Sequence, residues 1–300
     1  MIVGQYVFGK QTKDLTKLKD FSQIFIKTGI KKVRRASNAE TGLTLSIRAL
    51  KKLKKRVNLA KLNGLIYISQ SPDSTIPPTS SLIHKKFKLP LNCFTMDIIQ
   101  GCSSFPYAFF LASRYIKMGV IENCVILSAE TYGKYIEKNN RSCNTIFSDG
   151  ASAIYLDKKT KIKILSETYM SDGTGFEQLC LMKNKKLYMN GPAVFEFTRK
   201  IVPLAVKRLL KDSKLNLGEI DSFYFHQASK LVLDTIKDKL SISEKRIVRS
   251  PIDYGNTVSS TIPILLSDSI KNNKIKRKKP ILLMGFGVGY SLSGGIIKFE

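Results

Sequence analysis

The sequence has no tryptophan, only two histidines and 23 acidic residues in a chain of 300. Its five cysteines form no CxxC pair, which argues against both a disulfide framework and a zinc site. No apolar run reaches the roughly 18 residues that a membrane-spanning helix needs, and the first ten residues lack the cationic head and long apolar stretch of a signal peptide. We therefore expect a cytoplasmic protein with reduced thiols, no metal site and no membrane span.

The composition is that of a folded protein with an unusual charge. Hydrophobic residues make up 43% of the chain, which is enough for a sizeable core, while 50 lysines and arginines give a net charge of +27. Such a field attracts polyanions such as nucleic acid, anionic lipid or an acidic protein. Because the lysines are scattered through runs such as 51–56, 183–186 and 274–279, we interpret most of them as solvated faces and loops.

Short apolar, β-branched runs alternate with stretches of helical period, which favours an α/β fold in layers. Strands are predicted at residues 65–69, 94–99, 124–128, 152–156, 222–225, 281–284 and 294–299. Helices are predicted at residues 39–56, 103–118 and 193–211. Both halves carry a comparable run of elements, and the lysine-rich segment 158–163 is the best candidate for a joint. We therefore divide the chain into an N-terminal half, residues 1–160, and a C-terminal half, residues 161–300.

A cysteine at the start of a helix is the first chemical signal. Residues 94–105 read as a buried strand, a glycine turn and a helix whose first turn holds Cys102. Unpaired N–H groups and the helix dipole there would favour the thiolate, and the turn would present the sulfur to a substrate. On these residues alone, Cys102 could equally be a small buried hydrophobe. Cys93 and Cys124 lie in apolar runs and are expected in the core.

One histidine and one asparagine occupy comparable positions. His226 follows the apolar run 222–225, at the strand end where α/β enzymes expose chemistry, although a lone histidine there is more often structural. Asn256 lies in a Gly-Asn turn before a helix start, which alone is ordinary turn chemistry. His84 lies in a basic stretch and is expected at the surface. The glycine-rich segment 285–294 fails the dinucleotide pattern and predicts a loop whose N–H groups suit an oxyanion hole.

Together these segments resemble the thiolase superfamily, and most closely the β-ketoacyl-acyl-carrier-protein synthase III family. Seven segments in the same order carry the resemblance: Lys27-Thr-Gly-Ile-Lys-Lys, Gly101-Cys102-Ser, Phe147-Ser-Asp-Gly-Ala-Ser-Ala-Ile, Met189-Asn-Gly-Pro-Ala-Val-Phe-Glu-Phe, His226-Gln-Ala-Ser, Gly255-Asn256-Thr-Val-Ser-Ser-Thr-Ile-Pro and the terminal glycine segment. Each segment is weak alone, but the seven extend over most of the chain. The resemblance implies a five-layered αβαβα fold of two similar halves, assembled as a homodimer.

The resemblance also implies a reaction. Cys102 would attack an acyl thioester to form an acyl-enzyme, and a malonyl thioester on acyl carrier protein would then enter. His226 and Asn256 would donate hydrogen bonds to the malonyl thioester carbonyl while carbon dioxide leaves, and the N–H groups of Cys102 and Val288 would hold the oxyanion. No cofactor is implied; the substrates would be acyl-CoA or acyl-acyl carrier protein, and malonyl-acyl carrier protein. Because acyl carrier proteins are acidic, the excess lysine needs no nucleic acid partner.

Five positions bear on substrate binding in this family. Members that use coenzyme A usually carry a tryptophan and an arginine where this chain has Gln23 and Lys27, whereas Arg141 matches the second nucleotide-binding arginine of the family. Asp253 stands where an arginine often faces the phosphopantetheine or the carrier protein. Ile76 stands near the position at which members of the family often have a phenylalanine, and that phenylalanine forms the floor of the partner subunit's acyl pocket. These differences weaken the case for coenzyme A as donor and permit a primer other than acetyl.

Two other functions stay open on the sequence. One is acyl transfer from a thioester to a hydroxyl or amine of a specialised metabolite or a surface sugar, without decarboxylation. It needs Cys102 and His226 but tolerates changes at Asn256. The other is a basic nucleic-acid-binding protein on an inert scaffold of the same fold, which is disfavoured because no stacking aromatics interleave with the lysine runs.

Overall fold

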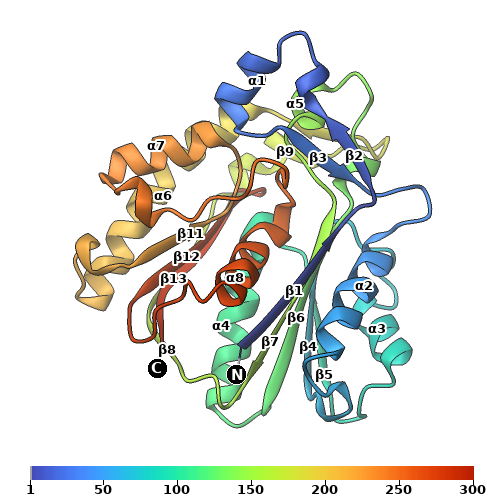
Figure 1. The fold of residues 1–300 in the computed structure, drawn as a ribbon, viewed down its shortest axis with the longest axis vertical. Coiled ribbons are helices and arrows are strands. Elements are labelled where there is room, and N and C mark those ends of the chain that lie inside the picture. Colours follow the sequence, from blue (N-terminus) through green and yellow to red (C-terminus); the bar gives the residue numbers. More distant parts are fainter. Residues whose placement is uncertain (1) are drawn as a thin grey trace.

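Two β-sheets face each other across a pair of buried helices (Figure 1). The computed structural model describes residues 2–300. The first sheet has the strand order β1-β7-β6-β4-β5, formed by Ile2–Phe8, Gly150–Asp157, Asn123–Glu130, Gly64–Ile68 and Phe94–Ile98. The second has the order β11-β12-β13-β8, formed by Ser222–Phe225, Ile281–Gly287, Ser291–Phe299 and Ile162–Ser171.

The two sheets repeat one pairing pattern. In the first, β1 and β6 both run antiparallel to β7, and β4 is parallel to β6. In the second, β8 and β12 both run antiparallel to β13, and β11 is parallel to β12. The place of β5 is taken by a single parallel bridge between Phe223 and Ile247. Residues 158–161 connect β7 to β8 and so lead the chain from one sheet to the other.

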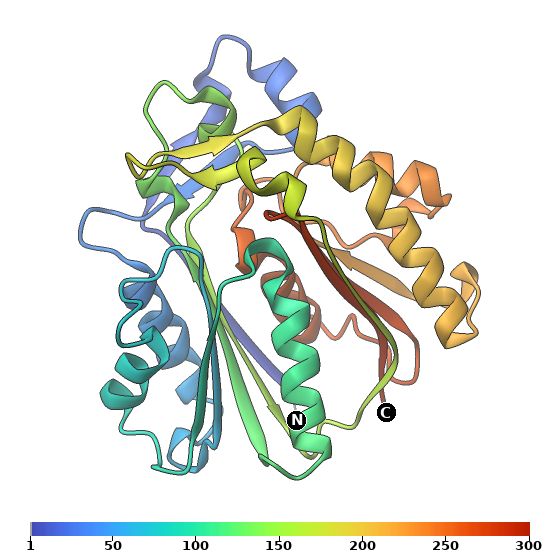
Figure 2. The ribbon, with the colours of Figure 1, turned by 180° about the vertical axis from the view of Figure 1, so that it is seen from behind.

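Helices complete five layers. Between the sheets lie α4 (Ser104–Lys117) and α8 (Thr261–Lys271), and each of them contacts strands of both sheets. The outer face of the first sheet is covered by α2 (Gly42–Lys54) and α3 (Thr79–Phe87), and that of the second by α6 (Gly191–Ser213) and α7 (Lys230–Leu240) (Figure 2). The expected αβαβα fold is confirmed. Among the helices of residues 2–300, none is long and apolar enough to cross a membrane.

Small elements gather at one end of the layers, above the sheets in Figure 1. They are α1 (Phe21–Thr28), α5 (Arg141–Asn144), the pair β2 (Gln11–Asp14) and β3 (Lys32–Arg35), and the pair β9 (Leu179–Leu181) and β10 (Leu187–Met189). Short 3-10 turns complete the chain: η1 (Leu15–Lys17), η2 (Leu59–Lys61), η3 (Gly101–Ser103), η4 (Tyr132–Lys134), η5 (Gly173–Gln178), η6 (Leu217–Glu219), η7 (Glu244–Arg246) and η8 (Val258–Ser260).

Every predicted strand and helix is present, and the differences lie at their ends and in one segment predicted as a loop. The helix expected from residue 39 starts at Gly42, because Thr41 caps it: the Thr41 Oγ1 accepts from the Thr44 N–H, and the Thr44 Oγ1 accepts from the Thr41 N–H. The terminal glycine segment, expected as a loop, is mostly strand. Its first glycines belong to β12, and only Val288, Gly289 and Tyr290 lie between β12 and β13.

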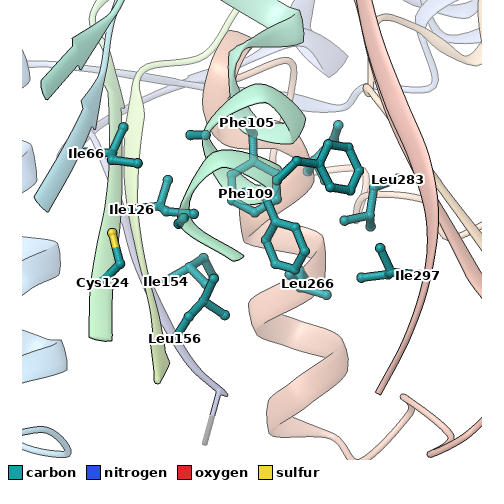
Figure 3. Close-up of a cluster of buried hydrophobic side chains, with 14 of the residues drawn as sticks. Ile66, Phe105, Phe109, Cys124, Ile126, Ile154, Leu156, Leu266, Leu283 and Ile297 are labelled. Carbon is teal, nitrogen blue, oxygen red and sulfur yellow. The ribbon is translucent and has the colours of Figure 1, made fainter. Parts of the chain in front are cut away.

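The core between the sheets is built around the apolar faces of the two buried helices. Phe105 and Phe109 of α4 and Leu266 of α8 lie between Ile126 of the first sheet and Leu283 of the second (Figure 3). Because α4 is covered on both sides, it is apolar almost all round at its start. This packing fixes where α4 begins, and therefore where the preceding Cys102 lies.

Removing one aromatic ring from this core should weaken the whole fold. Phe109 is fully buried, so Phe109→Ala is expected to lower the free energy of unfolding by about 3–5 kcal/mol. Met118, at the end of the same helix, is 73% exposed, and Met118→Ala is expected to change the free energy by less than about 0.5 kcal/mol. Urea denaturation measures both; equal effects would contradict the assignment of this core.

Candidate active site

Cys102 lies where β5 turns through η3 into α4. The turn depends on Gly101, whose φ of +53° suits glycine. A Cβ added there would lie 2.3 Å from the Val288 Cγ1 and 2.4 Å from the Gln70 Oε1, so a larger residue would displace both neighbours. Hydrogen bonds fasten η3 to β13: the Ser103 and Ser291 hydroxyls are 2.7 Å apart, and the Ser293 hydroxyl donates to the Ser103 carbonyl at 2.6 Å.

The glycine hairpin closes over Cys102 from the second sheet. A Cβ at Gly285 would lie 2.3 Å from the Cys102 carbonyl oxygen, and a Cβ at Gly287 would lie 3.3 Å from the Cys102 Sγ. The absence of side chains at these two positions therefore brings the backbone of the hairpin against the cysteine. The backbone N–H groups of Cys102 and Val288 lie close enough to the thiol to lower its pKa. These are the two donors that the sequence analysis named.

The ionisation of Cys102 differs from expectation. Burial raises the pKa of the thiol well above its ordinary value, and the nearby Glu130 raises it further, whereas hydrogen bonds from the Cys102 and Val288 N–H groups lower it. The free-energy cost of burying a thiolate therefore outweighs the stabilisation that the start of the helix gives to it. The pKa of the Cys102 thiol is therefore shifted in the direction opposite to the prediction of a favoured thiolate.

His226 follows β11 and is buried as a neutral imidazole. Burial lowers its pKa to about 3, and the edge of its ring packs on Phe286. The His226 Nδ1 lies 2.8 Å from the Thr261 Oγ1, which can also donate to the Val258 carbonyl at 3.1 Å. Because the Thr261 hydroxyl has one proton and two neighbours, it can accept from Nδ1 or donate to it. The His226 Nε2 can accordingly accept a proton or donate one.

Asn256 presents its amide N–H groups to the histidine. The Asn256 Oδ1 accepts from the Val258 N–H at 2.8 Å, which fixes the orientation of the amide. Its Nδ2 consequently faces the His226 Nε2 at 3.5 Å and the Ala228 carbonyl at 3.5 Å. This donor has no shorter partner among residues 2–300, so it is available to a substrate carbonyl.

The structure brings the three predicted residues together. Exposed fractions are 5% for Cys102, 2% for His226 and 4% for Asn256. The turn η3 contacts η8, and Val258 of η8 packs in one apolar cluster with Cys102. Cys102 is thus joined to the Asn256 segment through direct packing, although the two are far apart in sequence.

Two cavities flank this cluster. The α1/α7 cavity, of about 360 Å³, reaches the cluster at Gln227 and Gly255, the sequence neighbours of His226 and Asn256. The β9/β10 cavity, of about 320 Å³, reaches it at Val288 and Gln70, on the side of Cys102. The α1/α7 cavity is lined in part by charged residues of α7 and the segment after it, whereas the β9/β10 cavity is lined mainly by Phe176, Leu179, Leu181 and Leu187 together with Tyr132 and Tyr135.

The remaining predicted residues lie apart from the cluster. Lys27 is exposed on α1 and has no ion-pair partner among residues 2–300. Arg141 forms an ion pair with Asp20, and Asp253 lies 3.4 Å from the Lys32 Nζ. Ile76 is 92% exposed and lines neither cavity.

The other cysteines and histidine have simple surroundings. Cys93 and Cys124 are buried in the core, as predicted. His84, expected at the surface, is half-buried because its Nε2 lies 3.0 Å from the Pro90 carbonyl. In the part of the chain that the structure describes, no three His, Cys, Asp or Glu side chains are placed to hold a metal ion.

The sequence analysis missed Glu130, the last residue of β6. Its carboxylate accepts from the Ser259 hydroxyl at 2.6 Å, the Ser71 hydroxyl at 2.8 Å and the Gln70 N–H at 3.2 Å. Burial raises the pKa of Glu130 to about 7, although these hydrogen bonds lower it. His226 was predicted because it is a polar residue at the end of an apolar strand. Glu130 occupies the same kind of position, so the same pattern would have identified it.

Glu130 should make the stability of the fold depend on pH. A carboxyl whose pKa is raised by folding binds its proton more tightly in the folded state. Its contribution to the free energy of unfolding is therefore fully present below its ordinary pKa of 4.5 and is lost as the pH rises through about 7. Relative to Glu130→Gln, the wild-type free energy of unfolding is expected to fall by roughly 3 kcal/mol over this interval. Denaturation at pH 4.5 and pH 8 measures it; a constant difference between the two proteins would contradict it.

Comparisons with known proteins identify the family to which the chain is related. The 3-oxoacyl-acyl-carrier-protein synthase III model matches residues 96–173, and its C-terminal counterpart matches residues 210–299. A β-ketoacyl-acyl-carrier-protein synthase III of Streptococcus gordonii is 33% identical over 92% of this chain and 90% of its own, and one of Clostridium tetani is 30% identical over 95% and 93%.

Solved structures extend the likeness to the fold. A crystal structure of a 3-oxoacyl-acyl-carrier-protein synthase III aligns with a TM-score of 0.91 at 29% identity, covering 100% of this chain and 98% of the other. The enzyme of that name from Aquifex aeolicus aligns with a TM-score of 0.91 at 25% identity, covering 99% and 98%. With its buried cysteine, histidine and asparagine at the meeting of two sheets, the chain belongs to the β-ketoacyl-acyl-carrier-protein synthase III family.

Proposed function

We propose that the chain is a 3-oxoacyl-acyl-carrier-protein synthase III, an acyltransferase of fatty acid biosynthesis. It loads an acyl group on Cys102 and condenses it with malonyl-acyl carrier protein, with loss of carbon dioxide. The observation that carries the proposal is the packing of Cys102 against Val258, in the segment that holds Asn256 beside His226. Relatives of that name match over nine-tenths of the chain.

The first half-reaction transfers the acyl group to Cys102. The Cys102 Sγ bonds to the thioester carbonyl carbon, and the bond from that carbon to the donor's sulfur breaks. Because burial keeps Cys102 a thiol, its proton must leave as the new bond forms, and the neutral His226 Nε2 is the base that passes it to the departing thiolate. The N–H groups of Cys102 and Val288 stabilise the oxyanion, each by about 3 kcal/mol.

The second half-reaction needs neutral donors at the malonyl thioester carbonyl. The Asn256 Nδ2 donates one hydrogen bond, and the His226 Nε2 donates another when the Thr261 hydroxyl donates to Nδ1. The bond to the carboxylate breaks, carbon dioxide leaves, and the resulting enolate attacks the acyl carbon; Cys102 departs as a thiolate and takes up a proton. A charged imidazolium would attract the carboxylate and oppose its departure, and the pKa of about 3 keeps His226 neutral.

The two cavities suit the two parts of an acyl thioester. The β9/β10 cavity, lined by leucines and Phe176, suits the acyl chain, and the α1/α7 cavity suits the arm of the carrier. Lys27 beside the α1/α7 cavity is free to meet an acidic acyl carrier protein or a phosphate of coenzyme A. Arg141 could bind a nucleotide only by giving up Asp20, which favours a carrier protein as donor. The reaction calls for no cofactor.

The proposal includes a homodimer in the cytoplasm. Large apolar side chains are exposed beside the β9/β10 cavity, among them Phe176 and Ile99, and Ile76 is exposed on the loop that follows β4. A second copy would cover them, and Ile76 would reach its partner's acyl cavity. Five free cysteines suit a reducing compartment. The repeated strand pattern supports a division into residues 1–160 and 161–300.

Replacement of Cys102 tests the first half-reaction. We expect wild-type protein incubated with acyl thioesters of coenzyme A and of acyl carrier protein to gain one acyl mass, and Cys102→Ser to gain none. Cys180→Ser, which alters a more exposed cysteine, should keep the adduct. Intact-protein mass spectrometry measures this, and an equal adduct on Cys102→Ser would refute Cys102 as the nucleophile.

Replacement of Asn256 separates condensation from simple acyl transfer. Asn256→Ala loses the donor that faces the malonyl carbonyl, so we expect it to form the acyl-enzyme normally and to condense at least about 100-fold more slowly. Release of carbon dioxide from malonyl-acyl carrier protein measures the condensation. Condensation at the wild-type rate would favour the alternative, acyl transfer to a hydroxyl or amine without decarboxylation.

A further inference from the structure

The wall of the β9/β10 cavity next to Cys102 is polar, although most of the cavity is lined by apolar side chains. Gln70 and Tyr132 both belong to this wall, and the Tyr132 hydroxyl donates to the Gln70 Oε1 at 2.5 Å. The same oxygen would meet a Cβ placed on Gly101, the residue before the cysteine. Tyr132 also packs in one apolar cluster with Cys102. An acyl chain that starts at the Cys102 sulfur and enters the cavity therefore passes these polar groups first.

The hydrogen bond from Tyr132 fixes the orientation of the Gln70 amide. Because the Gln70 Oε1 accepts from a hydroxyl, the Nε2 forms the other arm of the amide and carries its two N–H donors. The backbone N–H of Gln70 donates to Glu130, but the Nε2 has no protein partner among residues 2–300. An alkyl chain laid over this amide would leave the donors unpaired and away from water, which is costly.

Two more polar groups without a partner line the same cavity. The Tyr135 hydroxyl forms no hydrogen bond within the described part of the chain, and the Tyr135 carbonyl accepts from the Leu187 N–H at 2.9 Å, which fastens this residue to β10. The side-chain amide of Gln100 is likewise without a partner in residues 2–300. The cavity therefore offers several hydrogen-bonding groups, all of them neutral, beside its apolar lining.

The charges around the cavity exclude an acidic ligand group. Of the residues that the structure describes, no lysine, arginine or histidine lines the cavity. The carboxyl of Glu130 accepts from the Gln70 N–H at 3.2 Å, so an acid lies next to the polar wall. A carboxylate on the ligand would be desolvated without a cation to pair with. A hydroxyl or a keto oxygen carries no charge and can still accept from an N–H or O–H donor.

We propose that the β9/β10 cavity selects a primer acyl chain that carries a neutral oxygen, as a hydroxyl or a keto group, and that the Gln70 Nε2 and the Tyr135 hydroxyl bind this oxygen. The inference rests on the proposed function, because it concerns the acyl group that Cys102 accepts. The leucines and Phe176 of the cavity contact the hydrocarbon part of the chain. A plain alkyl chain leaves the polar wall unpaired, and a chain that ends in a carboxylate brings a second acid toward Glu130.

The test is a competition between three thioesters on the wild-type protein. Butyryl, racemic 3-hydroxybutyryl and succinyl thioesters of acyl carrier protein are supplied at equal concentration, and intact-protein mass spectrometry compares the early rates at which Cys102 gains each mass. The 3-hydroxybutyryl adduct is expected to form roughly 3- to 10-fold faster than the butyryl adduct, which corresponds to about one hydrogen bond between neutral groups. The succinyl adduct should also form more slowly. A butyryl or succinyl adduct that forms as fast as the 3-hydroxybutyryl adduct would overturn the proposal.

Variants of the polar wall test the assigned residues through the ratio of the 3-hydroxybutyryl to the butyryl rate. The double variant Gln70→Leu with Tyr132→Phe removes the amide and leaves no hydroxyl unpaired, and its ratio is expected to fall to about one. Gln11→Leu, which changes an exposed glutamine on β2 away from the cavity, is the matched control and should keep the wild-type ratio.

A second variant keeps the test decisive if the double variant does not fold. Tyr135→Phe removes only a hydroxyl without a protein partner in residues 2–300, and it should lower the ratio roughly 3-fold. A wild-type ratio in Tyr135→Phe and in the folded double variant would contradict the assignment. Wild-type protein that gains no acyl mass from any of the three thioesters would refute the proposed function itself, whereas acylation without a preference refutes only this inference.

Discussion

The site depends on the burial of two equivalent helices, α4 and α8, between two sheets of the same topology. Each helix is preceded by a short turn, η3 before α4 and η8 before α8, and these two turns contact each other. The aromatic core around Phe109 therefore does more than stabilise the fold. By holding both helices between the sheets, it makes the segments that carry Cys102 and Asn256 meet at one point.

Burial also decides the charges in the site. Cys102, His226 and Glu130 are each displaced by desolvation toward the uncharged form, the first two strongly enough to be neutral at physiological pH. A neutral histidine and an amide can bind a thioester carbonyl without holding back the carboxylate that must leave. Glu130 is the one group of the three whose pKa, about 7, lies near physiological pH.

Much of this arrangement could be predicted from the sequence, because the polar residues of the site lie directly at the ends of apolar strands. His226, Asn256 and Cys102 were found from their places at strand and helix boundaries, and the resemblance of seven segments supplied the fold. The thiol state of Cys102 could not be predicted, since desolvation depends on what covers the sulfur, and that cover comes from Gly285 and Gly287, more than 180 residues away. For the same reason the pairing of Arg141 with Asp20 is invisible in the local sequence.

A crystal structure of the acyl-enzyme, prepared by soaking with an acyl thioester, tests the central claim most directly. The account predicts density for an acyl group bonded to the Cys102 Sγ, with its carbonyl oxygen about 3 Å from the N–H groups of both Cys102 and Val288 and its chain in the β9/β10 cavity. An acyl group on any other residue, or a carbonyl oxygen turned away from both N–H groups, would contradict it.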